Sequence, residues 1–513
     1  MCLSHSRSMQ HVFKISNRGR LAEVLILTCI IIGLLWQVGQ LARWVPFHDW
    51  DEAIYAQVAK EFVRAPQGAL TYNGALWFEK PPLPTLLYAI AWVLPLQPEL
   101  VARMISVIIS AIALLALYHI MKHLKMHTAI VLLVLMMTVL SAMYRDRSVL
   151  INVDIMLTAG WLVYLLGRMK EHAMLKTLGL LVGVWSKSFL GFFPLIADVG
   201  VSMITGKVKK RKAVEWIGMT AVALSWHMYM VVRYGMPFIQ SHFLDHLVAR
   251  VVRPIELHFG DKWFYLDKLW SELHVFGILA VLGMGIWAVH GARSYLKKES
   301  LPRQTSHLLT LALVPLAYLA LLTVSKSKLH WYTTPLIPFV AFWGGIFIQK
   351  THELIPPKYK KIIDTVAIFA VVISLLLFVQ SSRILDLKTY ISSEKIQMGQ
   401  CVSANSDKSD RLAYVLSPLE RQDIATVEAA QLQIGSSFIY GSAPAFLYYA
   451  DIPVQFVYRI ENLPAFIDQA TILVFDIDDA ESPFIQDVAQ TTEPSFASSA
   501  FCRTTHKVAY RLR

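Results

Sequence analysis

The sequence predicts a polytopic α-helical membrane protein with a small α/β domain at its C-terminal end. Hydrophobic residues make up 55% of its 513 residues and charged residues only 16%, whereas a soluble protein carries about 25% charged residues. Uncharged runs recur, such as ILAVLGMGIWAV from Ile278 and TVAIFAVVISLLLFV from Thr365. These runs approach the ~20 apolar residues that cross a bilayer as one helix. The composition therefore argues against a large soluble protein.

Basic residues predict how the chain is oriented. The net charge is +12, but the Lys and Arg residues gather in short clusters between the apolar runs. The clusters are residues 1–20, 122–125, 168–176, 207–212, 293–303 and 358–361. This placement is typical of cytoplasmic loops. We therefore expect a multi-pass protein of the inner (plasma) membrane, in contact with membrane lipids, with a cytoplasmic N-terminus and no nucleic acid partner.

Eleven apolar segments fit this orientation, at the lower end of the eleven to thirteen transmembrane helices that we expect. They are residues 21–43, 100–120, 127–143, 154–169, 174–186, 188–205, 214–232, 270–291, 307–324, 333–349 and 362–380. The segment 81–95, PPLPTLLYAIAWVLP, is short and holds four prolines. We expect it to lie at the outer interface and not to cross.

Three regions follow from this arrangement. They are a cytoplasmic N-terminus (1–20), a transmembrane region (21–380) whose first exterior loop is 44–99, and an exterior α/β domain (381–513). From about Ser381 the composition becomes that of an ordinary soluble domain. Two of its segments, FIYGSAPAFLYYA (438–450) and ATILVFDID (470–478), are predicted to be strands.

Two cysteines, Cys401 and Cys502, bracket the predicted exterior domain. The outside of a bacterial cell is an oxidising setting, which favours disulfides. Sequence spacing does not establish the geometry that a disulfide requires. Whether these two residues are paired therefore stays open at the level of the sequence.

The predicted topology places nearly every unusual charge on the outer face. This set comprises Asp51, Glu52, Glu79, Lys80, Arg145, Asp146, Arg147, Asp154, Lys187, the loop from Arg233 to Asp267, and SKSKLHWY at 325–332. Ionisable residues at membrane depth are expensive and mark functional sites by default. The sequence therefore predicts one outward-facing site that contains both carboxylates and cations.

Five motifs on this face resemble the GT-C glycosyltransferases, most closely the branch of protein mannosyltransferases and lipid A aminoarabinose transferases. They are DEAIYAQVAKEFV from Asp51, FEKPPLP from Phe78, NVDIML from Asn152, SKSFLGFFPL from Ser186 and SKSKLHWYTTPLIPF from Ser325. They stand in the order of that family and span about residues 45 to 350. The resemblance implies transfer of a sugar from an undecaprenyl-phosphate-type carrier to an exterior lipid A-like glycolipid, protein or cell-envelope polymer. The sequence identifies neither the sugar nor the acceptor.

The resemblance also implies catalytic roles for carboxylates. Asp51 matches the acid of the first loop, which is the candidate general base for the acceptor's proton. Glu52 beside it and Asp154 at the head of a span complete the catalytic candidates. The structural alternative for Asp51 and Asp154 is a helix N-cap, and for Glu52 a favourable interaction with the helix dipole.

The leaving group of such a reaction is a lipid phosphate, whose developing charge needs cations. The candidates for donor phosphate binding are Lys80, Lys187, Arg253, Lys326, Lys328 and Tyr332. Lys80 has the alternative of a lysine that snorkels to the interface. His246 and Arg250 share a predicted basic helix face with Arg253, which meets either the lipid phosphate or anionic headgroups. The chain has Ser188 and Ser327 where the family often has glycine, so the tight turn after Lys187 is in doubt.

Two residues match a metal-binding position of the aminoarabinose branch. They are Glu79 and His258, the latter in ELHFGDKWFY. A carboxylate and an imidazole suit a divalent cation, Zn²⁺ or Mg²⁺. Two ligands are few for such a site, and a single histidine in a loop is usually a polar surface residue.

Two other classes of protein stay open. A transporter or flippase of lipid-linked sugars would place charges near the midplane, often at broken helices, and would contain inverted repeats. The sequence has neither feature, since its charges gather at one rim. An envelope assembly protein whose exterior domain binds a partner would not need cations beside Asp51.

Overall fold

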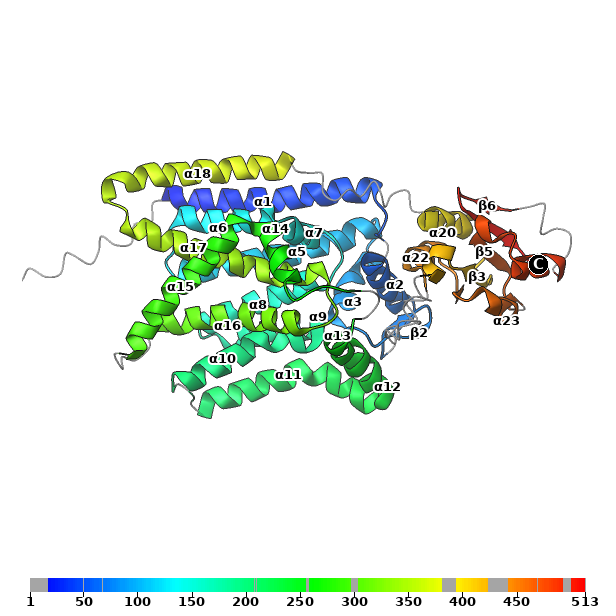
Figure 1. Cartoon of the computed structure of the whole chain (residues 1–513), viewed down its shortest axis with the longest axis horizontal. Helices are drawn as coiled ribbons and strands as arrows, with labels where there is room; N and C mark the ends of the chain where they lie inside the picture. Colours follow the sequence, from blue (N-terminus) through cyan, green and yellow to red (C-terminus); the bar gives the residue numbers. More distant parts are fainter. Residues whose placement is uncertain are drawn as a thin grey trace, which may run out of the picture.

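The computed structural model describes residues 17–512 except 49, 67, 207, 209, 255–257, 297–302, 381–393, 423–441, 468 and 492–499. It consists of a helical body with a smaller sheet domain at one end (Figure 1). The long helices of the body run roughly along the long axis of the molecule. The predicted fold class, a polytopic helical protein with a C-terminal α/β domain, is confirmed.

Each of the eleven predicted segments overlaps a helix of the body. The helices concerned are α1 (Asn17–Trp44), α5 (Pro98–His123), α6 (Thr128–Leu140), α8 (Asp154–Met169), α9 (Ala173–Lys187), α10 (Phe193–Ile204), α11 (Lys210–Tyr234), α15 (Val275–Leu296), α16 (Arg303–Val324), α17 (Ile337–Leu354) and α18 (Pro357–Gln380). Shorter elements connect them: α2 (Asp51–Arg64), β1 (Thr71–Tyr72), β2 (Ala75–Leu76), α3 (Leu83–Tyr88), α4 (Ile90–Val93), α7 (Ala142–Val149), η1 (Ser188–Phe192), α12 (Met236–Phe238), η2 (Ile239–Val248), α13 (Ala249–Val252), α14 (Phe264–Leu273) and η3 (His330–Leu336).

Fewer helices than expected are individually long and apolar enough to cross a membrane. Within the described residues there are six such segments, or eight if the bent pairs α6–α7 and α14–α15 each count as one span. The difference arises because the short helices α9 and α10, with 15 and 12 residues, together form one candidate, Ala173–Ile204. In addition, α8 has only 16 residues, below the ~20 of a full crossing, and α11 is not among the candidates. The proline-rich segment forms the short pair α3–α4, which is also too short to cross.

A glycine-lined contact between α8 and α9 positions two charged residues. A methyl group on Gly160 would lie 2.6 Å from the backbone nitrogen of Gly183, and one on Gly179 would lie 2.3 Å from that of Tyr164. These distances are too short for any side chain, so only glycine lets the two backbones approach so closely, as small residues do between membrane helices. Because the helices are antiparallel, the start of α8 at Asp154 meets the end of α9.

The sheet domain contains a five-stranded mixed sheet in the order β4-β3-β5-β7-β6. Its strands are β3 (Leu412–Val415), β4 (Val454–Val457), β5 (Ile472–Asp476), β6 (Cys502–Arg503) and β7 (Lys507–Arg511). β3 pairs in parallel with both β4 and β5. β7 pairs antiparallel with β5, and β6 pairs antiparallel with β7. Among the described residues, the helices of this domain are α20 (Glu394–Asn405), α22 (Pro444–Ala450), α23 (Pro464–Ile467) and α24 (Pro483–Thr491), with short turns η4 (Ile460–Asn462) and η5 (Ile477–Asp479).

One of the two predicted strands is correct. Residues 470–478 contain β5. The prediction for 438–450 is wrong in its second half, because Pro444 occupies the first turn of α22, where a proline with its fixed φ favours a helix. Its first four residues lie outside the described part of the chain.

The sheet domain is attached to the first loop (residues 44–99) through α22 and α2. Asp451, just after α22, accepts hydrogen bonds from Arg64 at 2.5 and 2.7 Å and pairs with Lys60 at 3.0 Å. Lys60 also donates to the carbonyl of Tyr448 at 2.6 Å. Burial lowers the pKa of Lys60 to about 8, although Asp451 acts to raise it. The sheet domain is therefore fixed to the helix that begins with Asp51.

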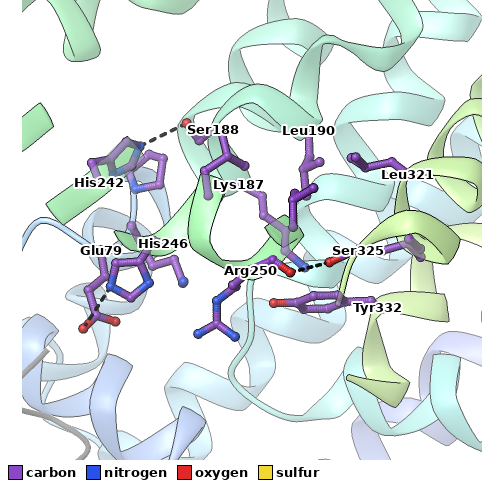
Figure 2. Close-up of a pocket in the computed structure, with 15 residues that line it drawn as sticks. Glu79, Lys187, Ser188, Leu190, His242, His246, Arg250, Leu321, Ser325 and Tyr332 are labelled. Carbon is purple, nitrogen blue, oxygen red and sulfur yellow. Dashed lines mark hydrogen bonds and ion pairs between the residues drawn. The ribbon is translucent and has the colours of Figure 1, made fainter. Parts of the chain in front are cut away.

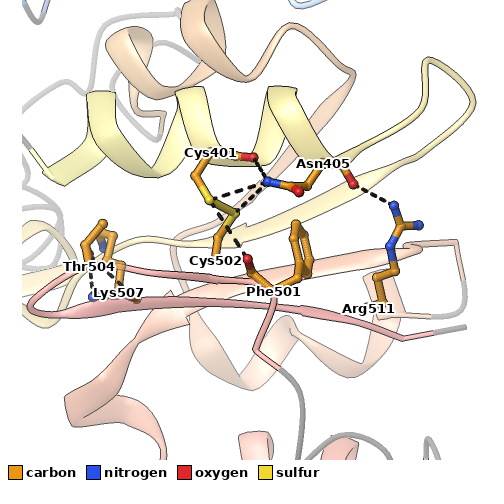
Figure 3. The surroundings of a disulfide bond; sticks show 7 residues. All are labelled: Cys401, Asn405, Phe501, Cys502, Thr504, Lys507 and Arg511. Atoms are coloured by element: carbon orange, nitrogen blue, oxygen red, sulfur yellow. Dashed lines mark hydrogen bonds between the residues drawn. A yellow bond between two sulfur atoms is a disulfide. The ribbon is translucent and has the colours of Figure 1, made fainter.

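A disulfide joins Cys401 in α20 to Cys502 in β6 (Figure 3). The two residues are 101 positions apart in the sequence. The bond therefore closes a loop that includes most of the sheet domain. The pairing that the sequence left open is present in the structure.

Replacing Cys401 by Ser is expected to lower the free energy of unfolding of the sheet domain by about 2–4 kcal/mol, because the unfolded chain regains the freedom of a long loop. Thermal unfolding in detergent under oxidising conditions measures the change. Cys29→Ser, at the free cysteine of α1, is the matched control. Equal stability of Cys401→Ser and wild type would contradict this expectation.

Candidate functional site

A pocket with about 720 Å³ of empty space opens between η2, the turn after α9 and the end of α16 (Figure 2). Its polar lining residues are Glu79, Lys80, Lys187, Ser188, His242, His246, Arg250, Ser325 and Tyr332. Its apolar lining residues are Pro81, Leu190, Leu247, Val251, Leu321 and Leu322. Three cationic side chains thus share the pocket with a single carboxylate and an aliphatic wall. Such a pocket suits an anionic group attached to an apolar chain.

Lys187 is held in place by two neighbours. Its ammonium group forms an ion pair with Asp154 and lies 4.0 Å from the ring centroid of Tyr332. The carboxylate of Asp154 is 3% exposed. It does not cap α8, because the side chain of Asn152 accepts the hydrogen bond from the N–H of Ile155 at 2.9 Å. Asp154 therefore orients Lys187, which lines the pocket.

The turn after Lys187 forms with a serine at position 188, where the resemblance led us to expect glycine. Ser188 has φ 52° and ψ −132°, a region that is sparsely populated for residues other than glycine and costs about 1–3 kcal/mol. Its hydroxyl lies 3.0 Å from Nε2 of both His227 and His242. These contacts attach the turn to α11 and to η2.

The proton positions in this network follow from one backbone contact. Burial lowers the pKa of His242 to about 3, so its ring is neutral at pH 7. Nδ1 of His242 lies 2.7 Å from the carbonyl oxygen of Phe78, which only accepts, so Nδ1 carries the proton. Nε2 of His242 therefore accepts from the hydroxyl of Ser188. The hydroxyl oxygen in turn accepts from the Nε2–H of His227.

Ser188→Ala is expected to be less stable than Ser188→Gly by about 1–2 kcal/mol. Both variants lose the two hydrogen bonds, but only glycine relieves the positive φ. Thermal unfolding in detergent compares the two variants. The control is the same pair of substitutions at Ser186, inside helix α9, where glycine should be the less stable by about 1 kcal/mol. The same order of stability at both positions would exclude backbone strain at Ser188.

The two adjacent acids of the first loop have different surroundings. Helix α2 begins at Asp51 and its N-cap residue is Trp50, so the alternative of an N-cap does not apply to Asp51. The carboxylate of Asp51 is 33% exposed and lies 3.4 Å from Nη1 of Arg147. Glu52 is 2% exposed and points into the body. Only Asp51 remains accessible from solvent.

Glu52 is fully engaged by the protein. Its two oxygens accept from Nε and Nη2 of Arg103 at 3.1 and 2.8 Å, and from the backbone N–H groups of His48 and Ile151 at 2.9 and 3.0 Å. Arg103 itself is 0% exposed. A carboxylate with four donors has no acceptor capacity for a substrate. We therefore reassign Glu52 from the catalytic set to a structural role that fixes the start of α2.

Tyr55, one turn after Asp51, connects the acids of the first loop with those of the body. It is 4% exposed. Burial raises its pKa well above the usual range, and the charges of Asp51, Asp154 and Glu79 raise it further. Three carboxylates from different elements are thus close enough to act on one hydroxyl. The structure brings Asp51 and Asp154 to the same side of the molecule, as the sequence predicts.

The histidine that accompanies Glu79 differs from the predicted one. Nε2 of His246 lies 3.4 Å from Oε1 of Glu79, and both side chains are largely buried. The backbone carbonyl of His258, the predicted histidine, accepts a hydrogen bond from the N–H of Lys328 at 3.0 Å. Among the described residues, Glu79 belongs to no group of three or more His, Cys, Asp or Glu side chains. Two ligands do not complete a Zn²⁺ site, so no chemical step is assigned to a metal.

The remaining predicted cations lie outside the pocket. Lys328 is 5% exposed and donates to the carbonyls of Leu322 and Thr323 at 2.7 and 2.9 Å, so it caps the end of α16 and does not face a ligand. Lys326 and Arg253 are exposed. The strand-like segment around Lys326 is joined to α13 by backbone hydrogen bonds, including one from its N–H to the carbonyl of Val251 at 3.1 Å.

Comparison with solved structures shows the fold. The structure matches ArnT from Cupriavidus metallidurans bound to undecaprenyl phosphate, with a TM-score of 0.67 over 96% of this chain and 98% of that chain. The chain has the ArnT fold. It also matches the apo state of the same protein, with a TM-score of 0.66 over 96% and 97% of the two chains. Sequence identity is 12% in both cases. No protein-family model and no curated protein matches the sequence.

Within this ArnT fold, several residues that shape the site were not predicted from the sequence. Arg103 lies inside a predicted span, where it is a single charge in an apolar run, and intramembrane charges point to a partner. His242 stands four residues before His246, a spacing that places both on one helix face. Tyr55 carries no sequence signal of its own, and the sequence marks Ser188 only as a departure from glycine. The roles of both residues depend on contacts between distant segments.

Proposed function

We propose that this chain is a membrane glycosyltransferase that moves a sugar from an undecaprenyl-phosphate-type donor to an acceptor on the face that carries the sheet domain. The observation that carries the proposal is the pocket, where three cations meet an aliphatic wall. The ArnT fold supports the same class of donor, because one of the matching structures holds undecaprenyl phosphate. The proposed acceptors are a lipid A-like glycolipid, a protein or a cell-envelope polymer, and the cell inner membrane is the proposed location.

The donor phosphate is assigned to the cations of the pocket. Lys80, Lys187 and Arg250 line it, and their charges oppose the charge that develops on the phosphate as it leaves. Lys187 is already oriented by Asp154, so little reorganisation is needed during the reaction. The polyprenyl chain would follow the wall formed by the end of α16. Arg253 and Lys326, both exposed beside these elements, are proposed to attract the phosphate as it enters.

The acceptor is activated by Asp51 in this proposal. The acceptor oxygen attacks the anomeric carbon, and its proton passes to the Asp51 carboxylate. The bond between the anomeric carbon and the phosphate oxygen breaks, and the oxygen keeps the electron pair. The products are the glycosylated acceptor, polyprenyl phosphate and protonated Asp51, which then returns its proton to water.

The test is glycosyl transfer by the purified protein in liposomes. A panel of radiolabelled polyprenyl-phosphate sugars is offered with envelope extract as acceptor. Lys187→Met is expected to lower transfer by about 10²–10³-fold, because it removes a preorganised cation from the leaving group. The control is Lys262→Met, at an exposed loop lysine.

Three outcomes separate the proposal from its alternatives. Label recovered in a new acceptor by wild type, and reduced by Lys187→Met alone, supports a transferase and names the sugar. Labelled donor that reaches the opposite leaflet unchanged, without transfer to any acceptor, would overturn the proposal in favour of a flippase. Equal transfer by wild type and Lys187→Met would remove the pocket from the mechanism.

A further inference from the structure

A second cluster of metal-ligating side chains lies far from the pocket, at the opposite end of the helical body. It consists of His127, directly before α6, His352 in the last turn of α17, and Asp364 in the second turn of α18. Figure 1 shows α17 ending and α18 beginning at the end of the body that is remote from the sheet domain. The cluster is therefore independent of the proposed glycosyl transfer.

The three side chains converge on one point. Nε2 of His352 lies 3.0 Å and Nδ1 of His127 lies 3.6 Å from Oδ1 of Asp364. All three ligand atoms lie within 4.8 Å of one another. A tetrahedral Zn²⁺ ion with bonds of ~2.0–2.1 Å separates its ligand atoms by ~3.3 Å. The two distances from Oδ1 of Asp364, 3.0 and 3.6 Å, lie on either side of this ~3.3 Å spacing. Small rotations of the imidazole rings would therefore place the three ligand atoms on one face of a tetrahedron.

We propose that His127, His352 and Asp364 bind a divalent transition-metal ion, Zn²⁺ in the first instance, that fastens α18 to α6 and α17. Two imidazoles and one carboxylate form a donor set that suits zinc, with water in the fourth position. The backbone N–H of His127 donates to Oε1 of Gln349 at 2.9 Å, which fixes the main chain on one side of the cluster.

Helix α18 is the element that gains most from such a clamp. Only 12% of its most apolar stretch is buried inside the protein, compared with 44–72% for the other five unbent candidate spans. Its far end leads toward the sheet domain. A metal bond at its start would replace packing that α18 lacks, and would set its position relative to the rest of the body.

The experiment measures zinc bound to the full-length protein, purified without a histidine tag. After incubation with ZnCl₂ and desalting, wild type is expected to retain one equivalent that is lost in His352→Gln and in Asp364→Asn. Glu353→Gln, next to His352 but outside the cluster, is the matched control. His246→Gln tests whether zinc at the pocket contributes. Both of these variants should keep the equivalent.

A second measurement does not depend on the folding of any variant. Co²⁺ added to wild type should give visible absorption typical of nitrogen coordination, which one equivalent of Zn²⁺ displaces. Zinc should also raise the unfolding temperature of wild type but not of Asp364→Asn, because a ligand of the folded state stabilises it. No bound zinc in wild type, or equal zinc in wild type, His352→Gln and Asp364→Asn, would overturn the proposal and leave a hydrogen-bonded Asp–His pair.

Discussion

Replacing Asp51 by Asn is expected to lower the rate of glycosyl transfer by about 10²–10⁴-fold, the usual contribution of a general base. Asparagine keeps the size and shape of the side chain but cannot take a proton. Because the carboxylate is one-third exposed and its ion pair within the described residues is with Arg147 at 3.4 Å, its loss should leave the fold intact. The rate is measured with saturating donor in a single turnover, where chemistry and product release are separated.

Binding and stability distinguish a catalytic loss from a structural one. Asp51→Asn should bind undecaprenyl phosphate with the affinity of wild type and unfold at the same temperature. The control is Asp261→Asn, which neutralises an exposed carboxylate that accepts the N–H of Trp263 at 2.9 Å. Transfer at the wild-type rate by Asp51→Asn would remove this residue from the mechanism. A reduced affinity for the lipid would instead place Asp51 in donor binding.

The features that could be predicted from the sequence are those that short segments encode. Each apolar run is a helix because its residues alone make it one, and the basic clusters between the runs indicate their ends. The carboxylate and lysine motifs at Asp51, Asp154 and Lys187 were identifiable because a charge at a membrane border has few ordinary explanations. These three residues lie at the same end of the body, as the predicted topology requires.

The features that could not be predicted depend on which distant segments meet. Glu52 and Asp51 are equivalent in the sequence, and only the position of Arg103, 51 residues later, separates their roles. Glu79 pairs with His246 because η2 turns His246 toward the first loop. Lys328 lies in a motif for which the resemblance implies phosphate contacts. In the structure it donates to carbonyls at the end of α16, where the last turn of a helix leaves its carbonyls without partners inside the helix.

Replacing Glu52 by Gln is expected to destabilise the protein by about 3–5 kcal/mol, because it leaves Arg103 buried without a counter-charge. The guanidinium group is 0% exposed and also donates to the carbonyls of Val45 and Pro46 at 2.8 Å, so it cannot turn toward water. Thermal unfolding in detergent at pH 7 measures the loss. Glu99→Gln, at a partly exposed carboxylate that accepts from Tyr449 at 2.9 Å, is the control and should change stability much less.

A double variant separates the ion pair from the shape of the site. Glu52→Gln combined with Arg103→Met removes both charges, so it should recover part of the stability that each single variant loses. Additive losses in the double variant would mean that the two residues act independently, which contradicts the assignment. Recovery would show that the penalty comes from the unpaired charge.

The pH dependence of this loss has a definite sign. Burial acts to raise the pKa of Glu52, but the charge of Arg103 and the hydrogen bonds outweigh it, so the pKa lies below its ordinary value. A carboxylate with a lowered pKa stabilises the folded state at pH values above ~4.3, its pKa in the unfolded chain. This stabilisation disappears as the pH falls through the pKa of the carboxylate in the folded protein. The difference in unfolding temperature between wild type and Glu52→Gln should therefore be greatest near neutral pH and shrink in acid. A difference that stays constant down to pH ~3 would mean that Glu52 is not ionised in the folded protein, and the role of its contact with Arg103 would have to be assigned to hydrogen bonding alone.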